Sequence, residues 1–174
     1  MPSFHHNNKC YILIADVYES WTAKANLCTK LAADWFNSTV AYGRTATFQN
    51  DDMWKEVMVN LANLAYKKSV PNGNINGGLL KVPEFVWLGA KASTKGCLLT
   101  DYCWMNDAST VGSQISRNPV ELLANCTLAP YCLSAYFEIK GKTITIKLYI
   151  QRCSVQRGVI CEFGKYLVVL GAKS

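Results

Sequence analysis

Apolar residues recur with helical spacing near the start of the chain. After a short apolar segment at residues 10–15, small or apolar side chains fall three or four positions apart, at Tyr18, Trp21, Ala25, Cys28, Ala32 and Trp35. That period places them in one stripe along an α-helix. Asp16 and Glu19 have the spacing of a capping box, so the pattern predicts a strand at 10–15 that leads into a helix capped by Asp16.

A second helix is predicted from Asn50 to Lys68. Its first turn contains two aspartates, which suit the positive end of the helix dipole. One face carries Trp54, Met58, Leu61 and Ala65. Pro71 ends the pattern, and the Asn- and Gly-rich segment 71–78 that follows is typical of a loop.

Strict alternation replaces this period in the back half of the chain. Ile144, Ile146, Leu148 and Ile150 alternate with polar or aromatic residues. Together with 134–139 they predict an antiparallel hairpin with a two-residue turn at 140–141 and one buried face. We also expect strands at 79–87, at 96–104 and between 159 and 170, and a short helix from Asn118, where proline follows the cap.

These elements predict an α+β fold, in which N-terminal helices pack on a mainly antiparallel sheet formed by the C-terminal half. A chain of 174 residues can bury one sizeable core, so we expect a single domain over 1–174, with a polar leader at 1–9 and an internal loop at 71–78. No apolar run approaches the roughly 20 residues of a membrane-spanning helix. The N-terminus lacks the apolar segment of a signal peptide, which favours a cytoplasmic protein.

Eight cysteines allow two interpretations. Cys28 lies in the helical stripe, where a small apolar residue serves well, so we expect mostly reduced, buried thiols. The alternative is a secreted, disulfide-linked binding module, which an even cysteine count and glycosylation sequons at Asn37 and Asn125 would suit. Metal binding is not expected, because no Cys-x-x-Cys pair is present and the only histidines are His5 and His6.

No catalytic constellation is recognisable. A serine or cysteine nucleophile usually needs a histidine base, and both histidines lie in the predicted leader. Phosphate-binding glycine loops are absent from the sequence. The carboxylates are expected at helix caps or, as for Glu138 and Glu162, at exposed strand positions. We therefore assign no catalytic residues, no cofactor and no metal.

Positive charge is concentrated around the predicted hairpin. The formal net charge is +6. Cations interleaved with aromatic rings can hold a phosphate backbone and stack bases. The candidate RNA- or DNA-binding residues are Lys140, Lys142, Lys147, Tyr149 and Arg152. The alternative interpretation is a solvated face that only aids solubility.

The segment from Trp21 to Lys55 resembles the first helical region of coat proteins from rod-shaped plant viruses of the tobacco mosaic type. The resemblance is carried by Asn26-Leu27-Cys28-Thr29, Phe36 and Trp54-Lys55. It implies a coat or accessory subunit of a virion that associates with itself and contacts RNA. Those proteins are largely four-helix bundles, however, whereas the back half of this chain predicts a sheet.

The resulting hypothesis is a non-enzymatic structural or interaction protein, self-associating and in contact with RNA, in the cytoplasm or a virion. Trp35, beside Asp34 and Asn37 near the helix end, is the candidate interface residue, and Trp21 is expected to be more deeply buried. Two alternatives stay open: a small-ligand-binding protein or enzyme with an apolar pocket between helices and a curved sheet, and the secreted binding module.

Overall fold

The computed structural model describes residues 2–36, 41–48, 51–69, 84–92, 102–105, 111–114, 120–122, 130–140 and 143–165. Within them the elements follow the order β1 (Ser3–His6), β2 (Lys9–Glu19), α1 (Trp21–Trp35), β3 (Ala41–Thr45), α2 (Asp51–Ser69), β4 (Glu84–Ala92), β5 (Tyr102–Met105), β6 (Val111–Gln114), β7 (Val120–Leu122), β8 (Tyr131–Lys140), β9 (Thr143–Arg152) and β10 (Arg157–Lys165). These strands join in one sheet, most of whose pairings are antiparallel, so the predicted α+β class is confirmed.

Strand β10 lies at the centre of this sheet. It pairs with β2 on one edge, and on the other with β4 near its start and with β3 near its end. The sheet continues from β4 through β8 and β9 to β7. Side chains in the middle of β10 are therefore enclosed by neighbouring strands on both sides.

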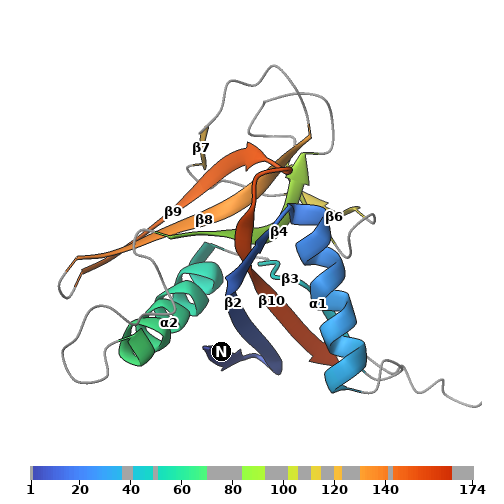
Figure 1. Ribbon diagram of the computed structural model, residues 1–174, viewed down its shortest axis with the longest axis horizontal. Helices are drawn as coiled ribbons and strands as arrows, with labels where there is room; N and C mark the ends of the chain where they lie inside the picture. The colour runs from blue at the N-terminus through green and yellow to red at the C-terminus, as the bar shows by residue number, and fades with distance from the viewer. Residues whose placement is uncertain are drawn as a thin grey trace, which may run out of the picture.

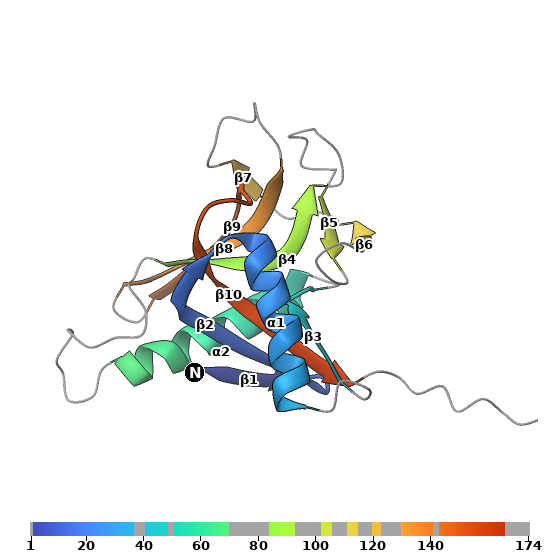
Figure 2. The same ribbon diagram turned by 45° about the vertical axis from the view of Figure 1, so that its right-hand side comes forward.

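The two helices lie on opposite faces of this sheet (Figures 1 and 2). One buried cluster contains Trp54, Met58 and Leu61 of α2 together with apolar residues of β2, β4, β8 and β9. A second cluster contains Trp21, Ala25 and other residues of α1, packed on β10. Among the described residues no helix is both long and apolar enough to cross a membrane.

Helix α1 carries the predicted apolar stripe but begins later than expected. Trp21, Ala25, Cys28 and Ala32 are buried. The helix is capped by Ser20, whose hydroxyl accepts a hydrogen bond from the backbone nitrogen of Ala23 at 3.4 Å. The predicted cap at Asp16 is wrong, because β2 continues past residue 15 and pairs with β10 as far as Glu19.

The close fit of α1 against β3 depends on a glycine. A Cβ atom at Gly43 would meet the backbone oxygen of Cys28 and lie 2.7 Å from the Cβ of Ala32. Only a residue without a side chain fits there. The Thr29 hydroxyl uses the same close approach to donate a hydrogen bond to the backbone oxygen of Gly43 at 3.2 Å.

Helix α2 begins and ends within one residue of the predicted bounds, and Trp54, Met58 and Leu61 of its predicted apolar face are buried. The loop predicted at 71–78 lies outside the described residues. The first strand, β1, occupies part of the segment expected to be a polar leader. It joins β2 through Asn7 and Asn8, whose φ angles of 48° and 61° suit a two-residue hairpin turn.

The predicted C-terminal hairpin is present as β8 and β9. Lys140 was expected in the turn but pairs with Thr143 as the last residue of β8. Leu148 and Ile150 are buried while Lys147 is exposed, which confirms the predicted alternation. The helix expected from Asn118 is wrong, because Val120–Leu122 form β7, whose backbone pairs in parallel with β9.

Candidate ligand-binding face

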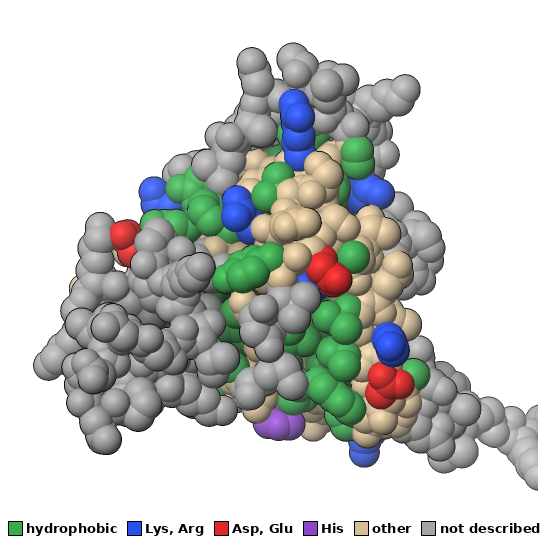
Figure 3. Space-filling view, in the orientation of Figure 1, with side chains coloured by type: hydrophobic (Ala, Val, Ile, Leu, Met, Phe, Trp, Pro, Cys, Tyr) green, Lys and Arg blue, Asp and Glu red, His purple; other side chains and the backbone are tan. Residues whose placement is uncertain are grey.

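One face of β4, β8 and β9 is not covered by α2 and carries aromatic and polar side chains. Alternation along the strands directs one set toward the α2-side cluster and the other set outward. We define the aromatic face by the residues on the side of these strands opposite the α2-side cluster, of which Ser134 and Gln151 are buried: Phe85, Ser134, Tyr136, Glu138, Lys147, Tyr149 and Gln151, with Arg157 from β10. Figure 3 shows hydrophobic and cationic side chains side by side over β8 and β9.

Three rings form the centre of the aromatic face. The centroid of Phe85 lies 4.8 Å from that of Tyr136 and 5.6 Å from that of Tyr149. The two tyrosine rings are 5.8 Å apart and meet edge to face. All three side chains are partly exposed. Because each comes from a different strand of one sheet, their relative positions are set by strand pairing.

Arg157 connects this cluster to a buried polar network. Its guanidinium lies 4.9 Å from the centroid of Phe85. Its Nε and Nη2 atoms donate to Oε1 of Gln151 at 3.3 and 3.2 Å. The Gln151 amide in turn donates to the Ser134 hydroxyl at 2.6 Å, and that hydroxyl donates to the backbone oxygen of Tyr149 at 3.3 Å. Gln151 and Ser134 are buried, so the guanidinium of Arg157 is held on the side that faces the sheet.

The predicted basic residues are only partly brought together. Lys147 is exposed and pairs across the hairpin with Tyr136, close to partly exposed Tyr149. Arg152 is exposed at the far end of β9, where alternation places it on the opposite side of the sheet from Gln151. For Lys140 the structure describes the backbone in β8, and Lys142 lies outside the described residues.

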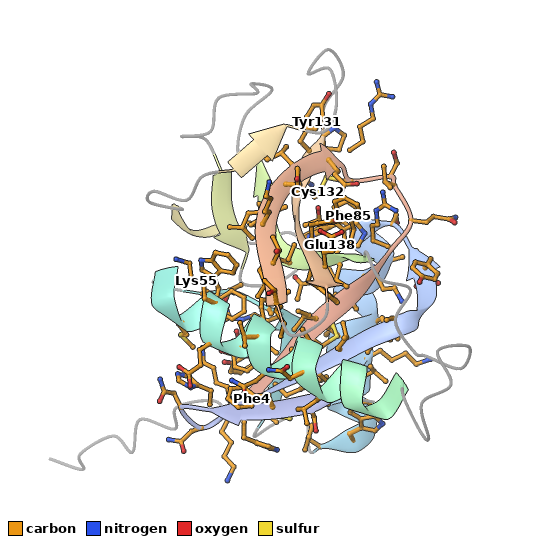
Figure 4. The ribbon with its side chains drawn as sticks, turned by 90° about the vertical axis from the view of Figure 1, so that its left-hand side faces the viewer. Phe4, Lys55, Phe85, Tyr131, Cys132 and Glu138 are labelled. Atoms are coloured by element: carbon orange, nitrogen blue, oxygen red, sulfur yellow. A yellow bond between two sulfur atoms is a disulfide. The ribbon has the colours of Figure 1, made fainter. Side chains whose placement is uncertain are left out.

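Phe85 and Arg157 complete the aromatic face but were not among the predicted binding residues. Phe85 is about fifty residues from the hairpin, and its outward position follows only from the register that aligns it with Tyr136. Glu138 lies on the same side of the sheet as Phe85 (Figure 4). The sequence shows that Arg157 lies close to the hairpin, which could have made it a candidate binding residue. It does not show that Arg157 lies over an aromatic ring.

Trp35 occupies a separate exposed position at the C-terminal end of α1. Its side chain is 42% exposed and that of Phe36 is 44% exposed. Both rings pack on Phe163, at centroid distances of 5.7 and 5.8 Å. Trp21 is fully buried, so the predicted order of burial is confirmed. The role of Trp35 in an interface stays a prediction.

A buried carboxylate lies near the middle of the sheet, at Glu162 of β10. The prediction that Glu162 is exposed is wrong, because β2 and β3 flank it and its exposure is 0%. Arg44 donates to its Oε1 atom from Nη2 at 2.8 Å, and the Lys9 ammonium lies 3.1 Å from the same atom. The Tyr42 hydroxyl donates to it at 2.9 Å, and the Thr47 backbone nitrogen donates to Oε2 at 3.2 Å.

The carboxylate of Glu162 helps to raise the pKa of two nearby tyrosines. Burial and the negative charge of Glu162 raise the pKa of Tyr42 above its usual value. The same two causes raise the pKa of Tyr11, which pairs with Glu162 across β2 and β10. Among the described residues the buried Tyr11 hydroxyl has no hydrogen-bond partner. The cations around Glu162 pair with it inside the fold, so loss of one partner would leave a buried charge uncompensated.

Two disulfides overturn the prediction of reduced thiols. Cys28 of α1 is bonded to Cys161 of β10, and Cys132 of β8 is bonded to Cys153 after β9. Cys28 lies in the apolar stripe of α1, as predicted. Because that stripe packs on the sheet, it brings the sulfur of Cys28 next to Cys161. Cys10 is free, and burial raises the pKa of its thiol. Among the described residues no three histidine, cysteine or acidic side chains group as metal ligands, so no metal site is assigned there.

Comparisons with known proteins identify the fold. No family model matches the chain, and no curated protein matches its sequence. The C-type lectin domain of murine dendritic cell inhibitory receptor 2, solved with an N-glycan, has a TM-score of 0.53 and 10% identity, over 92% of this chain and 94% of that one. The C-type lectin CEL-I from Cucumaria echinata has a TM-score of 0.52 and 8% identity, over 95% and 97%. Rhodocetin has a TM-score of 0.50 and 14% identity, over 93% and 94%.

This likeness shows a C-type lectin-like fold and corrects several predictions. The resemblance to plant-virus coat proteins is wrong, because the residues that carried it lie in α1, at its C-cap and in α2 of this fold rather than in a four-helix bundle. The predictions of a coat-protein function, of self-association and of an RNA or DNA partner are wrong as well. Disulfides persist in oxidising compartments, so an extracellular location is favoured and a cytoplasmic one is not supported.

Proposed function

We propose that this chain is a secreted, disulfide-linked binding module that recognises carbohydrate through the aromatic face. The observation that carries the proposal is the cluster of three partly exposed rings, Phe85, Tyr136 and Tyr149, on the sheet of a C-type lectin-like fold. Two structures similar to this chain are a C-type lectin and a receptor domain with a bound N-glycan. We further propose that residues 1–174 are one domain.

Ring chemistry supports a sugar as the ligand. The face of an aromatic ring carries partial negative charge and its edge partial positive charge. One side of a pyranose ring presents C–H groups, which complement such a face, while its hydroxyls need hydrogen-bond partners. Arg157, which the buried side chains of Gln151 and Ser134 hold in place, provides hydrogen-bond donors beside the rings.

The framework around the aromatic face is rigid, as a binding site requires. Cys132 lies two residues before Ser134 on the same side of β8, and its disulfide to Cys153 ties the start of β8 to the segment after β9. The backbone nitrogen of Cys153 also donates to the oxygen of Pro130 at 3.1 Å. A site on paired strands keeps its geometry better than one on a loop.

A glycan panel tests the proposal. The oxidised protein is applied to printed neutral and acidic glycans, with and without a metal chelator. We expect binding that persists with the chelator and that falls about two- to tenfold in Tyr136→Ala and Tyr149→Ala, because stacking on each ring is worth roughly 0.5–1.5 kcal/mol. The control is Phe36→Ala, which removes an exposed ring at the far end of α1 and should leave binding unchanged.

Three outcomes count against the proposal. Failure of the oxidised protein to bind any glycan would overturn carbohydrate recognition. Binding that is abolished by the chelator, or equally affected by Phe36→Ala, would place recognition away from the aromatic face. Thermal melts of each variant exclude loss of folding as the cause.

We also propose a protein contact at a second surface, around Trp35. Trp35 and Phe36 expose apolar rings beside Phe163 on the side of the sheet covered by α1. Cross-linking of the oxidised protein at Trp35, through a photoreactive residue, would reveal a protein contact there. A variant that gives no cross-linked product with the extracellular proteins of its source would remove Trp35 as an interface residue.

A further inference from the structure

The orientation of Arg157 is set by the residues beneath and beside it. Gln151 accepts hydrogen bonds from its Nε and Nη2 atoms, and Phe85 stacks near the guanidinium. Gln151 is itself fixed by the buried hydroxyl of Ser134. An arginine side chain usually loses much rotamer freedom when it binds a ligand. Arg157 has lost most of that freedom already in the fold.

The guanidinium keeps donors for another partner. Arginine has five N–H donors in a planar fork. Among the described residues Arg157 donates only to Gln151, through the edge formed by Nε and Nη2. The end of the fork formed by Nη1 and Nη2 is left to donate two hydrogen bonds to a carboxylate, and this bidentate arrangement is the geometry in which arginine binds carboxylates most strongly.

The charges on and around the aromatic face are mixed, on a chain that is basic overall. Lys147 is exposed one strand away, opposite Tyr136, and the whole chain has a formal net charge of +6. One acid belongs to the face and another lies beside it. Glu138 follows Tyr136 on β8, and Glu19 lies beside the start of β10 with its carboxylate 3.9 Å from the ammonium of Lys24.

We infer that Arg157 anchors a carboxylate of an acidic sugar whose ring stacks on the aromatic cluster. This inference rests on the proposed function. It specifies further that the ligand is anionic and that Arg157 binds its carboxylate. A uronic acid has the required shape, because its planar carboxylate projects from the edge of a pyranose ring. The guanidinium at Phe85 and the rings of Tyr136 and Tyr149 then contact adjacent parts of one monosaccharide.

Oligogalacturonate and its fully methyl-esterified form are matched probes for this test. They share the ring and the linkage, and only the first carries carboxylates. We expect the oxidised protein to bind oligogalacturonate at least about tenfold more tightly than the ester, since hydrogen bonds to charged groups are worth more than neutral ones. Arg157→Gln should abolish that difference, and Arg157→Lys should restore only part of it, because lysine keeps the charge but not the fork.

Arg152→Gln is the control, because it removes the same charge from the other side of the sheet. It should leave the preference for oligogalacturonate intact. Equal loss in the Arg152 and Arg157 variants would mean that net charge alone attracts the probe, and the inference would fall.

The remaining outcomes separate this inference from the proposed function. If the ester binds as tightly as the acid and Tyr149→Ala weakens both, the aromatic face binds sugar but Arg157 does not read a carboxylate. If neither probe binds while neutral glycans do, the acidic ligand is overturned and carbohydrate recognition stands. If no glycan binds at all, both proposals fail.

Discussion

The indole nitrogen of Trp21 donates a hydrogen bond to the backbone oxygen of Leu88 at 2.7 Å, in a fully buried environment. The contact joins the first turn of α1 to β4, across 67 residues of sequence. In the same region the indole of Trp87 donates to the backbone oxygen of Glu19 at 3.1 Å. The two tryptophans together lock the start of α1 onto the strand that carries Phe85.

Trp21→Ala is expected to destabilise the protein far more than Trp35→Ala. Truncating a buried tryptophan costs about 3–5 kcal/mol, and the lost indole also leaves the oxygen of Leu88 without its donor. Trp35 is 42% exposed and rests mainly on Phe163, so its loss should cost less than about 2 kcal/mol. Urea melts of the oxidised variants measure both values. Equal losses, or a larger one at Trp35, would refute this order.

The disulfide between Cys28 and Cys161 should stabilise the fold more than the one between Cys132 and Cys153. The first closes a separation of 133 residues and the second one of 21. Chain-entropy estimates then give about 5 and about 3 kcal/mol. The paired substitutions Cys28→Ala with Cys161→Ala, and Cys132→Ala with Cys153→Ala, isolate the two bonds. Intact mass before and after reduction and alkylation should detect both bonds, and equal stability losses would contradict the ranking.

Glu162→Gln is expected to lower the free energy of unfolding by about 3 kcal/mol. Removing one partner of a buried ion pair costs this much, and the value is at the low end because Arg44 and Lys9 keep some contact with solvent. Glu56→Gln is the matched control, since Glu56 is half exposed and lies 3.4 Å from His6. Its cost should not exceed about 1 kcal/mol. A similar cost for both variants would mean that the buried cluster does not stabilise the sheet.

Stability should decline at alkaline pH because of Tyr42 and Tyr11. Both have a pKa raised above the usual tyrosine value in the folded protein, so the folded state keeps its protons where the unfolded chain loses them. The stabilisation is complete below about pH 10, the unfolded pKa, and is lost as the pH rises above it. Tyr42→Phe should make the decline in the free energy of unfolding shallower, by up to about 1.4 kcal/mol per pH unit. Denaturant melts across this range test it, and an unchanged slope would contradict the assignment.

Local patterns predicted much of the fold. The period of α1, the acidic start of α2 and the alternation along β9 each depend on residues that are neighbours in sequence, and the structure confirms all three. The start of α1 differs from the predicted one. Pairing with β10 extended β2 past Asp16, which moved the helix cap to Ser20.

By itself, the sequence determined the class of the fold and which residues of α1, α2 and β9 face inward, because amphipathic periods record burial directly. It did not determine which distant segments meet. Cys28 lies 133 residues from Cys161, and nothing in the spacing of eight cysteines selects that bond. Glu162 became buried, and Arg157 came to lie over Phe85, only because strand order placed β10 in the centre of the sheet beside β2, β3 and β4. Register and strand order depend on the packing of the whole chain, so the binding face was decided by the tertiary structure.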